Sequence, residues 1–344
     1  IKKFIDFGDL PVFPDASTYP CVIIIQKTYS NNNKMLVSKI DSLKFDRLET
    51  KIEDIEFPLN QSNLDEGIWN FEKPEITQIY NKIKSCGTPL KEYSNAKINR
   101  GLLTGLNEVF IINKEKKNRL EENSISSKEL IKPYLTGQEI KRYSINWSRD
   151  YILLIKKGTK IEQYPAIMDY VTPYRKKLEK RSDKGDWFSL RACKFYDDFK
   201  KPKIIYAQFS KRPEFTYDED GFYVSQNAFI IPSDDMYIVA ILNSNVIAFY
   251  SHSICPFIKG EFYQYSPQFV NQFPIPNVID SIRSKLVNLV NEIMKLEKNL
   301  LNIQNTFLNR LLDEFDLIKL PIQFYGFYKM EDKYFIKQIK KLTK

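Results

Sequence analysis

The chain has 344 residues, of which 43% are hydrophobic and 14% aromatic, so it can bury a sizeable core and is not disordered in bulk. Its length favours two or three domains. The only histidine is His252, which makes histidine-based hydrolytic triads and histidine-rich metal sites poor interpretations. The 11 glycines form no dinucleotide-binding or P-loop pattern, so these nucleotide-binding motifs are excluded.

The four cysteines are widely spaced and form no C-x-x-C pair. This spacing is typical of reduced thiols, so we expect a cytoplasmic protein. No apolar run approaches the ~18 residues that a membrane span requires, and we expect no membrane partner. Because the chain opens with Ile1 in a strand-like run, we expect it to be a fragment of a longer polypeptide.

The positive charge is concentrated in one part of the chain. The formal net charge is +9; residues 151–212 carry 16 basic and 7 acidic residues, whereas residues 213–277 carry 1 and 7. Lysine and arginine residues that neutralise phosphates dominate the affinity of proteins for nucleic acids, so this distribution favours a polyanionic partner. Solvated helix faces in a lysine-rich protein are the alternative interpretation.

The N-terminal residues have the pattern of strands from an α/β sheet. We predict strands at residues 1–7, 21–27 and 35–41, and the continuous β-branched run of the second favours a strand buried on both faces. These would be the last strands of a sheet whose earlier part is missing. Residues 42–74 are mixed and acidic, which indicates a linker, and residues 76–84 have helical spacing.

The middle of the chain is predicted to be rich in short strands. Strands are expected at residues 96–101, 106–113, 151–155, 203–209, 214–217 and 222–232. Helices or helical turns are expected at residues 114–123, 128–134, 165–181 and 236–251. From Ile279 to Phe315 apolar residues recur mostly at spacings of three and four, which predicts a long helix, an antiparallel helical pair or a coiled coil. A last helix is expected at residues 334–342.

Several segments, taken in order, carry a resemblance to one known family. They are IDFGDLPVFPDASTYPCVIII at residues 5–25, TGLNEVFII at 104–112, LIKPYLTGQEIKRY at 130–143, the strand-rich run at 199–231, YIVAILNSNVIAFY at 237–250 and FVNQFPIP at 269–276. Together they resemble the C-terminal part, with the target-recognition or specificity domain, of TaqI-like adenine-specific DNA methyltransferases. Such enzymes include single-chain type II (IIG) restriction–modification enzymes and related phage-defence methylases.

The resemblance implies an α+β fold in four parts. These are the C-terminal edge of a methyltransferase domain at residues 1–41, a linker with short elements at 42–95, a DNA target-recognition domain at 96–277 and a coiled-coil-like helical tail at 278–344. The catalytic tetrapeptide of the family and its S-adenosylmethionine loop do not occur in this sequence. We therefore expect no cofactor and no catalysis in the fragment. S-adenosylmethionine would serve the full-length parent, and whether that parent also cleaves DNA stays open.

Two sets of DNA contacts follow from the resemblance. Phe13, in the segment VFP, matches the aromatic residue that stacks on the flipped-out target adenine. The segment IKGEFYQY matches a loop that approaches DNA, where Lys259 would contact the duplex and Tyr263 would wedge at a base step. For both aromatic residues, ordinary packing is the alternative interpretation.

Further DNA contacts are predicted from basic and polar residues near predicted strand ends and on a basic helix. They are Lys156, Lys157, Arg175, Lys176, Arg191, Lys194, Gln208, Ser210, Lys211 and Arg212. Lysines are expected to hold phosphates, whereas arginine and glutamine can read base edges. Plain solvent exposure is the alternative for most of them. For Arg191 and Lys194, which flank Trp187, Phe188 and Phe195, the alternative is a small satellite core.

Three functions are weighed against these features. The leading one is sequence-specific recognition of double-stranded DNA, with the duplex presented to a methyltransferase domain of the same chain. The second is a protein–protein interaction or dimerisation module of a defence complex, built on the helix at residues 279–315. A free-standing nuclease would need clustered carboxylates, and the acidic run at residues 218–220 is better explained as a hairpin tip.

Overall fold

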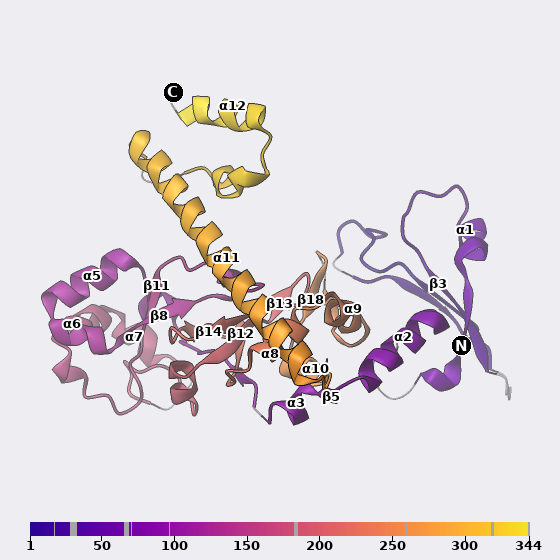
Figure 1. Ribbon diagram of the computed structural model, residues 1–344, viewed down its shortest axis with the longest axis horizontal. Helices are drawn as coiled ribbons and strands as arrows, with labels where there is room; N and C mark the ends of the chain where they lie inside the picture. Colours follow the sequence, from indigo (N-terminus) through magenta and orange to yellow (C-terminus); the bar gives the residue numbers. More distant parts are fainter. Residues whose placement is uncertain are drawn as a thin grey trace.

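The structure is a computed structural model that describes residues 1–16, 18–27, 33–64, 69, 71–95, 97–181, 185–258, 260–317 and 320–342. It contains both helices and several small sheets, which confirms the predicted α+β class. Figure 1 shows a small N-terminal body beside a larger central body. The long helix α11 (Asp280–Glu314) crosses the central body and ends near the C-terminal helix α12 (Asp332–Leu342).

The N-terminal body is built on a four-stranded sheet with the order β2-β1-β3-β4. Its elements are β1 (Lys3–Asp6), β2 (Cys21–Ile24), β3 (Lys34–Lys39), β4 (Phe57–Asn60) and the helix α1 (Leu48–Ile55). One face of the sheet packs Met35 and Leu59 together, and the other packs Ile5 against Ile52 of α1. The sheet therefore runs to Asn60, beyond the boundary predicted at residue 41, because β4 pairs with β3 rather than serving as a linker.

The strand β2 departs from the prediction in its burial. Val22, Ile23 and Ile24 are 43–45% exposed, so the strand predicted to be buried on both faces is an exposed edge strand. It pairs with β1 on one side only, and no other described strand pairs with its second edge. A continuous β-branched run predicts a strand correctly, but it cannot report which layers lie above and below it.

The central body is organised around a sheet with the order β14-β12-β16-β6. Its strands are β6 (Asn99–Arg100), β12 (Lys203–Ala207), β14 (Phe215–Asp218) and β16 (Ala228–Ile231), which confirms the strands predicted there. Side chains alternate across the sheet, so Ile205 enters one hydrophobic core while Ile204 and Tyr206 enter another. The sheet is thus the wall shared by two cores.

The first core is closed by a second sheet and several short helices. Its elements are α4 (Asn107–Phe110), β7 (Ile111–Ile112), α5 (Lys114–Asn123), β8 (Ile131–Leu135), β11 (Asp150–Leu153), α6 (Pro165–Val171), α7 (Arg175–Glu179) and β15 (Tyr223–Val224). The strand predicted at 106–113 begins as the helix α4, and the helix or turn predicted at 128–134 is mainly the strand β8. Pairing with β11 and β15 overrides local preference in β8.

The second core lies between the central sheet and helices on its other face. Its elements are α2 (Pro74–Ser85), α8 (Met236–Leu242), α9 (Asn245–Ile254) and α10 (Pro267–Val270), together with a small sheet of β13 (Phe209–Ser210), β17 (Phe257–Ile258) and β18 (Phe262–Gln264). The single helix predicted at 236–251 is two helices, because Ser244 starts a new one by accepting the N–H of Ile247 on its hydroxyl.

The 35-residue helix α11 confirms the long helix predicted from the apolar spacing. Val290 of α11 is buried in the second core, and the Arg283 guanidinium pairs with Asp235 at 2.7 Å. The distal end packs Leu308 with Leu320 and Phe324, against residues of α12. Four short strands complete the chain: β5 (Thr88–Pro89), β9 (Ile140–Lys141), β10 (Ser144–Ile145) and β19 (Pro274–Ile275).

Candidate nucleic-acid interface

Phe13 lies in the loop between β1 and β2. The loop turns at Gly8, whose φ is +55° and whose N–H bonds to the Asp6 carboxylate at 2.8 Å. The side chain of Phe13 is 61% exposed at the rim of a small cavity of about 50 Å³ that Leu10 and Tyr19 also line. The ring is therefore accessible to a base, and its stacking role stays a prediction.

Tyr19 connects this loop to the small sheet of the second core. Its ring centroid lies 6.4 Å from that of Phe257 on β17, in an edge-to-face arrangement. Phe257, Phe262 on β18 and Phe209 on β13 are exposed large aromatic residues. We call the three strands with these three residues the aromatic ribbon. It leads from the Phe13 loop to the end of β12.

The end of β12 gathers five of the predicted contacts. The pairing of β13 with β18 sets Ser210 opposite Tyr263, next to Gln208, Lys211 and Arg212. Ser210 is buried, and its hydroxyl donates to the Arg212 carbonyl at 2.6 Å. Ser210 therefore shapes the turn and does not present its hydroxyl to solvent.

Two of the cations in this group have protein partners. The Arg212 guanidinium donates to the Asn245 side-chain oxygen at 3.2 Å. The Lys211 ammonium lies 2.6 Å from the Glu261 carboxylate and holds the pKa of that carboxyl below its usual range. Both residues of the Lys211 pair are exposed, and such surface pairs contribute little to stability because solvent screens them. Lys211 can therefore exchange Glu261 for a phosphate at little cost.

Tyr263 is half-buried. Its ring stacks on His252 with centroids 4.5 Å apart and an interplanar angle of 8°, and burial raises its pKa. Phe262, its neighbour on β18, is exposed as strand alternation requires, and so offers the more accessible wedge. His252 itself is exposed, and its ring packs on one face of the Tyr263 ring. Lys259 lies outside the described residues.

The other six predicted contacts lie on segments that surround the first core, and we call them the basic lobe: Lys156, Lys157, Arg175, Lys176, Arg191 and Lys194. The segment after β11 lies against the segment before Arg191, since the Leu190 N–H bonds to the Ile155 carbonyl at 2.8 Å. The Lys156 ammonium lies 4.7 Å above the ring of Tyr196. Lys157, Lys176 and Lys194 are exposed.

Arg175 is already engaged within the basic lobe. Its guanidinium lies 5.2 Å above the Trp187 ring, and its Nε donates to the Glu179 carboxylate at 2.7 Å. Both members of this ion pair are exposed, so it does not exclude a phosphate.

Two cations of the charged stretch 151–212 are structural. Arg181 donates to the carbonyls of four residues: Thr104, Leu178, Trp187 and Ser189. Lys203 is fully buried and pairs with Asp218 at 2.5 Å. Asp218 also accepts the N–H groups of Asp220 and Phe222, so it anchors the turn from inside and is not part of an exposed hairpin tip. Sequence charge therefore overstates the charge available to DNA.

Sequence reasoning missed Arg100. Its Nε donates to the Gln226 carbonyl at 2.7 Å, and its Nη2 donates to the Gln208 side-chain oxygen at 3.4 Å. Arg100 is 108 residues from Gln208 in the sequence, so only the pairing of β6 with β16 brings them together. The adjacent Gly101 is the one sequence signal of a close backbone approach at this place.

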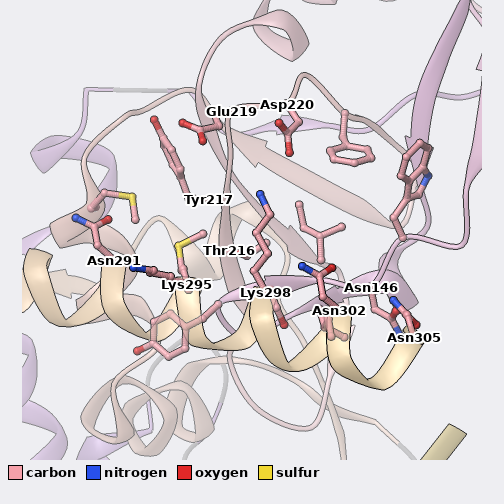
Figure 2. A pocket seen from close by; sticks show the side chains of 18 of the residues that line it. Asn146, Thr216, Tyr217, Glu219, Asp220, Asn291, Lys295, Lys298, Asn302 and Asn305 are labelled. Atoms are coloured by element: carbon pink, nitrogen blue, oxygen red, sulfur yellow. The ribbon is translucent and has the colours of Figure 1, made fainter. Parts of the chain in front are cut away.

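A larger cavity, about 560 Å³, lies elsewhere (Figure 2). It is bounded by α11, by the β9–β10 hairpin and by the turn after β14, and it contains none of the predicted DNA contacts. Lys298 of α11 points across it toward Glu219 and Asp220. Arg149 and Lys295 also line it, so its lining carries three basic and two acidic side chains.

The cavity beside Phe13 is too small to hold S-adenosylmethionine. Pockets for ligands of this size occupy about 300–1,000 Å³, whereas the cavity beside Phe13 measures about 50 Å³. The large cavity lies against α11 rather than beside the Phe13 loop.

No group of three metal-ligating side chains occurs among the described residues. No helix in the described ranges is long and apolar enough to cross a membrane.

Two parts of the chain match known families. Residues 132–275 match the family described as TaqI-like C-terminal specificity domain, and residues 279–344 match a domain of unknown function, DUF8810. The type II methyltransferase M.MjaIV of Methanocaldococcus jannaschii is 26% identical over 235 residues, 63% of this chain and 76% of that protein. The type II methyltransferase M.BanIII of Aneurinibacillus aneurinilyticus is 27% identical over 165 residues, 41% of this chain and 28% of that protein.

A solved structure shares the fold. The type IIL restriction–modification enzyme MmeI in complex with DNA superposes with a TM-score of 0.52 and 14% identity, covering 100% of this chain and 42% of that one. The matched residues 132–275 run from β8 to β19 and include β12, β14 and β16 of the central sheet, where the predicted contacts Gln208 to Arg212 lie. Residues 132–275 are thus similar to a TaqI-like C-terminal specificity domain, as the sequence motifs indicated.

Proposed function

We propose that this chain binds double-stranded DNA and selects the sequence on which an adenine-specific methyltransferase or restriction–modification enzyme acts. The observation that carries the proposal is the continuity of the aromatic ribbon. Through Tyr19 and Phe257 it joins the loop of Phe13 to the strand end that bears Gln208 and Lys211. A residue that stacks on an extruded base and residues that read neighbouring bases must meet the same duplex.

The basic lobe and the residues at the end of β12 have different roles in binding. The lysines of the basic lobe hold phosphates and fix the register of the duplex, which carries no sequence information. Gln208 and its neighbours reach base edges, which carry the specificity. Lys211 leaves Glu261 to join the phosphate contacts.

The chemistry is supplied by a methyltransferase domain of the parent polypeptide, which binds S-adenosylmethionine. Edge strand β2 supports this part of the proposal. It exposes Val22, Ile23 and Ile24, and its outer edge pairs with no described strand. Exposed apolar edge strands are rare in stable domains because they invite pairing, so we assign this edge to the remainder of the methyltransferase sheet.

The salt dependence of duplex binding tests the proposal. A variant with Lys156, Lys157, Lys176 and Lys194 replaced by alanine should bind all sequences more weakly. The slope of log K against log salt should fall by about 0.9 for each phosphate that the variant no longer neutralises. The matched control replaces Lys329, Lys333, Lys337 and Lys341 of the tail, so it removes the same charge. Equal binding by the lobe variant and the parent chain, or an equally weakened control, would contradict the assignment.

A second candidate function is dimerisation through α11. Ile282, Leu289, Leu296 and Ile303 recur every seven residues and are 45–66% exposed, which is typical of an unpaired coiled-coil seam. Replacing Leu289, Leu296 and Ile303 by glutamate leaves buried Val290 in place and should convert a dimer to a monomer in gel filtration with light scattering. If the unmodified chain is monomeric at about 100 µM, this candidate is wrong.

A further inference from the structure

We propose that Arg100 reads a guanine in the major groove and that Gln208 and the Gln226 carbonyl hold it in the reading orientation. This inference rests on the proposed DNA binding and adds a specificity-determining residue to it. It depends on three features of Arg100. Its backbone is held in place by its neighbours, some of its guanidinium N–H groups have no acceptor in the described part of the chain, and it lies between the two groups of predicted contacts.

The backbone around Arg100 is fixed on both sides. Asn99 is buried and donates to the Asp198 carboxylate at 3.0 Å. On the other side, a Cβ on Gly101 would lie 2.0 Å from the Ser225 carbonyl oxygen, so only glycine fits there. The Gly101 N–H bonds to the Ala228 carbonyl at 2.9 Å. The Cα of Arg100 therefore has little freedom to move.

Two hydrogen bonds orient the guanidinium of Arg100, and its other N–H groups remain available to donate. The Nε and one Nη2 hydrogen are directed to Gln226 and Gln208, and the remaining N–H groups of Nη1 and Nη2 have no acceptor among the described residues. Those N–H groups form the end of the guanidinium fork. The same fork donates to O6 and N7 of guanine in the commonest specific contact to DNA.

The charge of Arg100 is also uncompensated. Within the described ranges it forms no ion pair with a carboxylate, whereas Arg175 and Arg283 do. Its two partners are neutral oxygens. Such a cation is exposed, stays fully charged and needs no partner to be displaced before it meets a base.

The surroundings of Arg100 point to base reading rather than to phosphate contact alone. Gln226 and Asn227 are exposed in the loop between β15 and β16, beside Gln208. The backbone of Gly137 packs closely against this loop, since a Cβ there would lie 3.0 Å from the Asn227 carbonyl oxygen. Side-chain amides pair with adenine as arginine pairs with guanine, so this cluster offers donors and acceptors for adjacent base pairs.

Arg100 also lies between the two groups of predicted contacts. Through Asn99 and Asp198 it adjoins residues 196–200, where Tyr196 supports Lys156 of the basic lobe. Through Gln208 it adjoins the aromatic ribbon. A duplex that touches both groups passes over this position.

Selection of bound duplexes from a randomised pool, followed by sequencing, tests the inference with the 344-residue chain. The unmodified chain should enrich one G·C pair that Arg100→Ala no longer prefers, with a loss of discrimination of about 5- to 150-fold. Arg100→Lys should lose it too, because lysine has no bidentate fork. Arg119→Ala, an exposed arginine on α5 paired with Glu115, is the matched control and should leave the motif unchanged.

The possible outcomes separate this inference from the proposed function. If the unmodified chain binds no duplex, the proposed function fails. If it binds duplex and Arg100→Ala keeps the same motif, or weakens all sequences equally, Arg100 is not a base reader and the proposed function stands. Gln208→Ala guards against misfolding of the arginine variant. It removes one orienting contact and should weaken discrimination at the same G·C pair, while unchanged discrimination would overturn the orienting role.

Discussion

Lys203 and Asp218 are fully buried and join two strands of the central sheet. Burial raises the pKa of the Asp218 carboxyl and lowers that of the Lys203 ammonium, while each charge opposes the shift of the other. The Phe199 carbonyl accepts a further bond from Lys203 at 2.6 Å. With this acceptor and the two N–H groups that Asp218 binds, the buried charges are satisfied, which such pairs require.

Asp218→Asn should therefore be strongly destabilising. It leaves the Lys203 ammonium buried without its counter-charge, and breaking such a pair costs about 3–5 kcal/mol. Urea unfolding followed by circular dichroism measures the change. The neighbouring Glu219→Gln is the control, because Glu219 is exposed and should change stability by no more than about 0.5 kcal/mol. A small effect of Asp218→Asn would show that the pair contributes little.

The cysteines should differ in reactivity. Burial raises the pKa of the Cys255 thiol to about 12, so at pH 8 it remains protonated and unreactive in the folded chain. Cys21 and Cys86 are exposed and should react with a thiol reagent. Mass spectrometry of the folded and the urea-unfolded chain locates the label. Early labelling of Cys255 in the folded chain would contradict its burial.

At the residue scale, the sequence grouped neighbouring residues more reliably than it gave the direction of their side chains. The strand exit after β12 was predicted with Gln208 and Lys211, and the fold places both beside Ser210 and Tyr263. Ser210 is buried and Tyr263 is half-buried, because the direction of a side chain depends on the pairing of β13 with β18. Arg100 carried no local signal of its contact with Gln208.

At the scale of elements, β6 depends on Gly101 for its place in the central sheet. Gly101→Ala should destabilise the chain by about 1–3 kcal/mol, because the added methyl group collides with the Ser225 carbonyl. The same substitution at Gly326 meets no atom within 4 Å and should be neutral or slightly stabilising. Thermal unfolding compares the two variants. Equal melting temperatures would mean that β6 shifts without cost.

Element type was predictable where the pattern is long or the ends are marked. The helix at 114–123 was predicted with its observed bounds, since Asn113 caps it by accepting the Lys116 N–H, and α11 was predicted from its apolar spacing. Residues 128–134 were assigned wrongly because β8 gains its pairing from strands far away in sequence. The N-terminal sheet extends past residue 41 for the same reason.

At the scale of the whole molecule, two cores share the central sheet. All five residues of β12 are buried, and both neighbouring strands pair with it. Its amides should exchange with solvent more slowly than any others, because their exposure requires both cores to open. The amides of β2 that face the unpaired edge should exchange quickly. Hydrogen exchange with mass spectrometry compares the two strands, and equal protection would contradict the shared-core description.

The overall charge was a fair guide to a basic lobe but not to its extent. Lys203 and Arg181 bond to groups inside the protein, and several surface lysines are paired with carboxylates. A sequence gives the sum of charges, whereas the charge open to a partner depends on pairings that only the fold creates.

The anchoring of α11 at one end has a mechanical consequence. A helix of 35 residues is about 52 Å long, and its first turns are clamped by Val290 and the Arg283 pair while the cluster around Leu308 lies at its far end. The helix thereby holds the C-terminal cluster at a fixed distance from the second core. Lengthening the helix by whole turns would change that distance without altering the proposed DNA contacts.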